Sequence, residues 1–176
     1  IARERGLEDI RLVRGGAEDI PFAAGSFQGV TCRVSAHHFA DVPRFLSEAC
    51  RVLQPDGSVI IADTSSPDDA PPLSRWFNEV ETMRDPSHHQ NYSPAQWRDM
   101  AEGARLRVEC LDYSQRIRLR FSSWVARSGT PQEQVVLLHK SFLNAGEETK
   151  AFFQIEQNGD EIDFTWPLAR MKAVKP

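Results

Sequence analysis

Residues 14–63 read RGGAEDIPFAAGSFQGVTCRVSAHHFADVPRFLSEACRVLQPDGSVIIAD, and this stretch decides how the rest of the chain is organised. It contains an acidic loop, an apolar strand, a loop with two histidines, a helical segment, a tight turn at 55–57 and a second strand. Such an alternation is typical of half of a doubly wound nucleotide-binding sheet, in which ligands bind at the carboxyl ends of the strands. Both loops that could bind a ligand follow predicted strands.

The remaining elements are predicted from hydrophobic periodicity and from capping and turn residues. Asp41 is a good helix N-cap, and Ser93 starts a capping box. The pair Asn158 and Gly159 favours a hairpin turn before the last strand. The apolar run at 59–62 is expected to be a parallel strand covered on both faces. We predict strands at 10–13, 27–34, 59–62, 106–121 and 162–174, and helices at 42–53, 73–83, 94–104, 131–143 and 149–155, after the last turn of a helix at 1–5.

Composition limits the class of protein. The chain has 176 residues, of which 40% are hydrophobic and 26% are charged, as expected for a single globular domain. Its net charge of -4 disfavours a general nucleic-acid binder, which would carry a basic face. No apolar run reaches the roughly 18 residues of a membrane helix. The three cysteines are far apart and form no CxxC, so we expect free thiols in a reducing cytoplasm.

Four motifs within 14–63 resemble the class I S-adenosylmethionine-dependent methyltransferases, in particular the type 11 group that includes ubiquinone/menaquinone-biosynthesis enzymes. The resemblance continues at MRDPSHHQNYSPAQW (83–97) and in the closing strand, so it covers nearly all of the chain. It implies an α/β Rossmann-like sheet with an antiparallel last strand. It also implies transfer of a methyl group from S-adenosylmethionine to a small-molecule acceptor. The four motifs are AEDIPF (17–22), SF (26–27), HHF (37–39) and RVLQPDG (51–57).

The family's first strand, its glycine-rich loop and the acidic residue that holds the ribose do not occur in these 176 residues. We therefore expect the C-terminal portion of a single methyltransferase domain, 1–176, lacking its first two strands. Residues 65–105 would form a lid and substrate region, and residues 121–157 a helical insert before the last strand. Such a chain alone is expected to bind the cofactor poorly and to be inactive.

The resemblance assigns two loops to the cofactor. Gly16, Ala17 and Glu18 would face the adenine, and Gly16 stands where the family commonly has an Asp or Asn acceptor. The loop after the next strand, with Arg33, Val34 and His38, would run beneath the methionine part.

The acceptor side is predicted from polar and aromatic residues near the strand ends. His37 and His38 could include a general base or position the substrate, or could simply be packed loop residues. No metal site is expected, because adjacent side chains diverge and no third ligand is fixed by spacing. Asp63, His88 and Trp76 could contact the acceptor. The alternative for Asp63 is an N-cap or loop carboxylate, that for His88 is a solvated loop, and that for Trp76 is core packing.

Two other classes of function stay open. One is a Rossmann-type NAD(P)-dependent oxidoreductase, and the other is a non-catalytic interaction protein that keeps the methyltransferase fold. We expect a small molecule as partner, with neither nucleic acid nor membrane, and we keep a homodimer as an option. The sequence does not identify the methyl acceptor.

Overall fold

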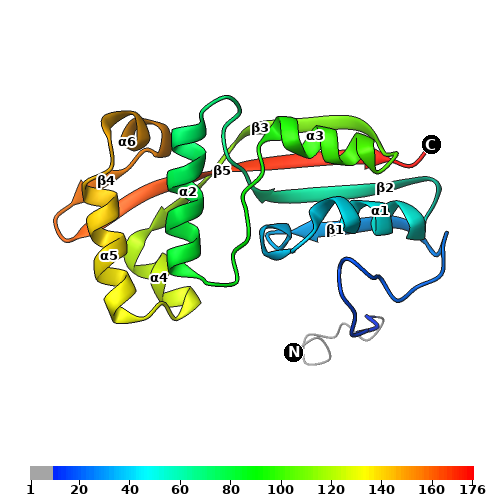
Figure 1. The fold of residues 1–176 in the computed structure, drawn as a ribbon, viewed down its shortest axis with the longest axis horizontal. Coiled ribbons are helices and arrows are strands. Elements are labelled where there is room, and N and C mark those ends of the chain that lie inside the picture. Colours follow the sequence, from blue (N-terminus) through cyan, green and yellow to red (C-terminus); the bar gives the residue numbers. More distant parts are fainter. Residues whose placement is uncertain (1–9) are drawn as a thin grey trace.

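The computed structural model describes residues 10–176 and shows an open, mixed sheet with helices packed against it (Figure 1). The part predicted as a helix turn at 1–5 lies outside the described residues. The strands are β1 (Phe27–Arg33), β2 (Leu53–Thr64), β3 (Arg107–Arg120), β4 (Glu156–Asn158) and β5 (Glu161–Val174). Their order in the sheet is β1-β2-β5-β3, and β4 pairs with the first residues of β5.

The first half of the chain forms the predicted parallel unit. β1 and β2 are parallel, and helix α1 (Val42–Val52) connects them. Asp41 caps α1 as predicted, because its carboxylate accepts the backbone N–H of Arg44 at 2.9 Å. The carboxyl ends of both strands therefore point toward the same part of the molecule, which is where ligands of such sheets bind.

The last strand makes the sheet mixed. β5 is antiparallel to both β2 and β3, as the resemblance implies. Figure 1 shows β3 and β5 running on past the end of β2, so that they form the floor of a second, helix-covered half. Around this sheet lie α2 (Pro71–Arg84), α3 (Pro94–Gly103), α4 (Phe121–Ser128), α5 (Gln132–Leu143) and α6 (Glu147–Phe153).

Two hydrophobic clusters correspond to the two halves. In the first, α1 and α3 pack on β2 and on the end of β5, with Trp97 almost completely buried. In the second, α2, α4, α5 and α6 enclose an aromatic cluster over the other end of β5. That cluster includes Phe77, Phe121, Trp124, Phe142, Phe153, Phe164 and Trp166.

Three predictions about local structure were wrong. Residues 10–13 form no strand, and Leu12 is 84% exposed, because no strand within 10–176 lies beside them to complete a ladder. The turn predicted at 55–57 is an irregularity inside β2, in which Asp56 adopts a φ of 62° and bonds to Lys175. The run at 59–62 is covered on one face only: Ile60 is 47% exposed because α1 and α3 pack on the opposite face.

Replacing Phe142 by alanine is expected to lower the free energy of unfolding by about 3–5 kcal/mol, because it leaves a cavity among Trp76, Trp124 and Phe164. Leu137 lies on the same helix but is 49% exposed, so Leu137→Ala should cost less than about 1 kcal/mol. Urea denaturation measures both variants. Similar losses would mean that the aromatic cluster does not hold the insert on the sheet.

Candidate functional site

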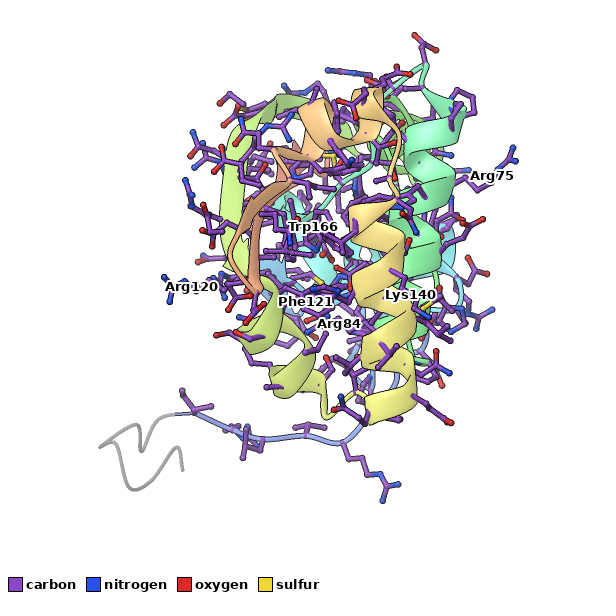
Figure 2. All side chains as sticks on the ribbon, turned by 90° about the vertical axis from the view of Figure 1, so that its left-hand side faces the viewer. Arg75, Arg84, Arg120, Phe121, Lys140 and Trp166 are labelled. Atoms are coloured by element: carbon purple, nitrogen blue, oxygen red, sulfur yellow. The ribbon has the colours of Figure 1, made fainter. Side chains whose placement is uncertain are left out.

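A cavity of about 350 Å³ lies at the carboxyl ends of β1 and β2, between the two halves of the molecule. Figure 2 looks at the helical half from its end and shows Trp166 and Arg84 near the middle of the view. The cavity volume is in the range of small-molecule sites. The lining residues are Arg33, Val34, His37, Thr64, Glu81, Arg84, Ile117, Leu119, Trp124, Arg127 and Trp166.

Asp63 organises the loop between β1 and α1. The side chain is fully buried, and Oδ2 accepts the backbone N–H groups of Ser35 (3.2 Å), Ala36 (2.6 Å) and His37 (3.3 Å). Oδ1 accepts the N–H of Thr64 at 2.8 Å and lies 2.6 Å from His37 Nδ1. Both oxygens are therefore occupied by the chain itself. This placement agrees with the alternative of a carboxylate that binds a loop, and a contact of Asp63 with an acceptor stays a prediction.

His37 is held in one orientation by this carboxylate. Because an ionised carboxylate only accepts hydrogen bonds, Nδ1 carries the hydrogen, and a neutral ring has its lone pair on Nε2. Burial lowers the pKa of His37, but the hydrogen bond and the charge of Asp63 outweigh it, so the pKa is raised above its ordinary value. The residue also lines the cavity. The ring of His37 is thus held in one orientation at the strand ends.

Two further histidines lie beside His37. The ring of His38 is 4.2 Å from that of His37, and its Nδ1 is 3.0 Å from the carbonyl oxygen of Ser87. The ring of His88 is 5.6 Å from His37, and its Nε2 donates to Asn78 Oδ1 at 3.0 Å. Neither His38 nor His88 is among the residues that line the cavity.

His88 is only 6% exposed, so the solvated-loop alternative for it is wrong. Burial, and then the charges of His37 and His38, lower the pKa of His88 to about 4. The ring is therefore neutral at pH 7, and its buried Nδ1 has no hydrogen-bond partner among residues 10–176. A contact of His88 with the acceptor stays a prediction.

The acidic loop lies against the start of α1 rather than along the cavity. Glu18 Oε1 accepts the N–H of Ala40 at 3.0 Å, and the Glu18 carbonyl accepts Arg44 Nε at 2.7 Å. Gly16 is exposed, and a Cβ added there would meet no atom closer than 3.9 Å. None of Gly16, Ala17 and Glu18 lines the cavity, and a contact of these residues with the cofactor stays a prediction.

Arg33 and Val34 both line the cavity. Val34 has a φ of 49°, a left-handed conformation that is strained for a β-branched residue, and its N–H donates to the carbonyl of Ala62 at 2.8 Å. Strain of this kind is often found at ligand sites. Trp76, by contrast, packs against Phe142 and Phe153 and does not line the cavity, which is the core-packing alternative.

The sequence did not predict the wall of the cavity that lies opposite the ends of β1 and β2 and is formed by residues of α2, α4 and β5. Glu81 is 6% exposed, and its carboxylate accepts Trp166 Nε1 at 2.5 Å and Arg84 at 3.1 Å. Trp124 and Arg127 come from α4, which lies far from β1 in the sequence. The only local signal was the three-residue spacing of Glu81 and Arg84 on one helix, which by itself suggests a surface ion pair.

A larger hollow of about 550 Å³ is lined by residues of α4 and α5 and by Asp160 and Glu161. No predicted site residue lines it, so the cavity at the strand ends is the better candidate.

Within residues 10–176, no group of three or more His, Cys, Asp or Glu side chains could hold a metal ion. In the same range, none of the helices has both the length and the apolar character needed to cross a membrane.

Comparison with known proteins agrees with this fold. The profile of the family described as methyltransferase domain matches residues 1–61. The uncharacterized methyltransferase YcgJ of Bacillus subtilis (strain 168) is 34% identical over 176 residues, covering 99% of this chain and 69% of the relative. A crystal structure of the B. subtilis YcgJ protein has a TM-score of 0.89 at 32% identity and covers 99% of this chain and 74% of that one.

More distant matches are also named methyltransferases. A demethylmenaquinone methyltransferase of Symbiobacterium thermophilum is 43% identical over 58 residues, 33% of this chain and 23% of the relative. A structure of geranyl diphosphate methyltransferase in complex with SAM shares the fold, with a TM-score of 0.63 at 14% identity, covering 99% of this chain and 62% of that one. The family match and the YcgJ relative indicate an enzyme of methyl transfer. They give no support to the expectation that the chain is inactive alone.

The low pKa of His88 should appear in the pH dependence of stability. The unfolded chain binds a proton at His88 near pH 6.5 and the folded chain only near pH 4, so stability is lost as the pH falls through this range. Between pH 7 and pH 5, the unaltered protein should lose about 2 kcal/mol more than His88→Gln. Urea denaturation at the two pH values tests this; equal losses would mean that His88 is protonated in the fold.

Proposed function

Because this chain belongs to the class I S-adenosylmethionine-dependent methyltransferases, we propose that it transfers a methyl group from S-adenosylmethionine to a small-molecule acceptor. The acceptor would occupy the cavity at the carboxyl ends of β1 and β2. The observation that carries this proposal is the buried Asp63, which fixes both the loop after β1 and the ring of His37 at that cavity.

The residues of this chain fit the cofactor at two places. Gly16, Ala17 and Glu18 would hold the adenine, and the space around Gly16 allows a flat ring to approach the backbone. Arg33, Val34 and His38 would hold the methionine part. When bound, the cofactor supplies a methyl group on a positively charged sulfur, a chemistry that needs alignment more than a covalent intermediate on the protein.

His37 is the proposed catalytic base for acceptors that must lose a proton. Its Nε2 would take the proton of the acceptor's O–H or N–H group as that atom forms its bond to the methyl carbon. Asp63 would stabilise the resulting imidazolium through the 2.6 Å contact at Nδ1. The ring of His38 would support that of His37 from the side, at 4.2 Å.

We also place this reaction in the cytoplasm. Cys32 is buried as a free thiol, and Cys50 and Cys110 are free as well. Free thiols of this kind fit a reducing compartment.

The test is calorimetric binding of S-adenosylmethionine and of NADH to the protein that contains residues 1–176. We expect binding of S-adenosylmethionine only. Gly16→Asp should tighten this binding roughly fivefold, because the new carboxylate can accept the adenine amine and fits without a clash. Gly16→Ala is the control and should leave the affinity unchanged.

Tight binding of NADH without S-adenosylmethionine would favour the oxidoreductase alternative. Binding of neither would favour an interaction protein that keeps the fold. Equal effects of Gly16→Asp and Gly16→Ala would mean that this loop does not face the adenine.

A further inference from the structure

We infer that the methyl acceptor is an anionic small molecule with an apolar body, and that Arg127 binds its anionic group. This inference rests on the proposed function, since it concerns the cavity in which the acceptor would react. It follows from the charges, the apolar walls and the position of His37 in that cavity.

The cavity is positively charged although the chain as a whole carries a net charge of -4. Three arginines line it, Arg33, Arg84 and Arg127, against the single carboxylate of Glu81. A cleft with one sign of charge concentrates ligands of the opposite sign. The local charge is thus opposite to that of the rest of the protein, and it favours an anion.

Arg84 is already committed within the protein. Its guanidinium donates to Glu81 at 3.1 Å and to the carbonyl of Trp124 at 3.0 Å, and it lies 5.0 Å above the ring of Trp124. Glu81 in turn accepts the indole N–H of Trp166. This pair is therefore neutral as a unit and forms part of the wall.

Arg127 and Arg33, unlike Arg84, form no ion pair with another described residue. Among residues 10–176, neither guanidinium lies within salt-bridge distance of a carboxylate. Arg127 is exposed on α4, and Arg33 ends β1 in the loop that is proposed to hold the methionine part of the cofactor. A guanidinium presents paired N–H donors that match a carboxylate or phosphate. Arg127 is the one that belongs to the acceptor side alone.

Five of the eleven lining residues are apolar. Ile117 and Leu119 project from β3, and the rings of Trp124 and Trp166 close the same space. The other six lining residues are polar or charged, and in small-molecule sites such groups fix orientation while apolar groups supply the contact area. An acceptor with an apolar body and one anionic end would satisfy both parts of the wall, with its reacting atom near His37.

The test uses octanoate and 1-octanol, which share an apolar chain and differ in charge. Binding is followed by tryptophan fluorescence, because Trp124 and Trp166 line the cavity. We expect octanoate to bind at least about tenfold more tightly than 1-octanol. Arg127→Gln should abolish this difference, and Arg127→Lys should keep part of it. Arg75→Gln is the control, since Arg75 points away from the molecule in Figure 2; it should change nothing.

No binding of octanoate by the unaltered protein, or equal binding of the two probes, overturns the inference. So does an Arg127→Gln variant that binds octanoate normally.

A second arm separates the acceptor from the carboxylate of the cofactor itself. Arg127→Gln should bind S-adenosylmethionine as tightly as the unaltered protein. A variant that loses the cofactor but keeps octanoate would place Arg127 at the cofactor and overturn the inference. If octanoate behaves as expected while S-adenosylmethionine never binds, the proposed methyl transfer fails and the anion site stands.

Discussion

The arrangement of the site depends on one buried carboxylate at the end of β2. Asp63 accepts three consecutive backbone N–H groups, from Ser35, Ala36 and His37, and also orients the ring of His37. A buried charge is tolerated only when hydrogen bonds compensate its lost hydration, and here the two neighbouring strand ends supply them. This one side chain therefore joins the end of β2 to the loop after β1, and fixes the geometry of the proposed base.

The second wall of the cavity comes from a different source. β3 and β5 extend past the end of β2 (Figure 1). The aromatic cluster packs between these extended parts and the helices α2, α4 and α5. Hydrogen bonds from the backbone N–H groups of His89 and Gln90 to the carbonyl of His37 join the segment between α2 and α3 to the loop after β1. The two halves thus contact each other at His37, His89 and Gln90, and Glu81 and Arg84 line the cavity between them.

Local signals predicted the elements well but not the cavity. The caps at Asp41 and Ser93 and the antiparallel last strand are confirmed, because each depends on nearby residues or on the family resemblance. The strand predicted at 10–13 was wrong, because a strand forms only beside a second strand, and the local sequence does not show whether one lies there. Arg127 was missed for the same physical reason: its place in the site depends on how α4 packs, not on its own surroundings in the sequence.

The most direct test of the account is amide hydrogen exchange at Ser35, Ala36 and His37 in the unaltered protein and in Asp63→Asn. The amide that replaces one carboxylate oxygen would present donors to donors, so these three N–H groups should exchange at least about tenfold faster. Asp99→Asn, on the exposed face of α3, is the matched control and should leave them protected. Unchanged protection in Asp63→Asn would contradict the central role given to this carboxylate.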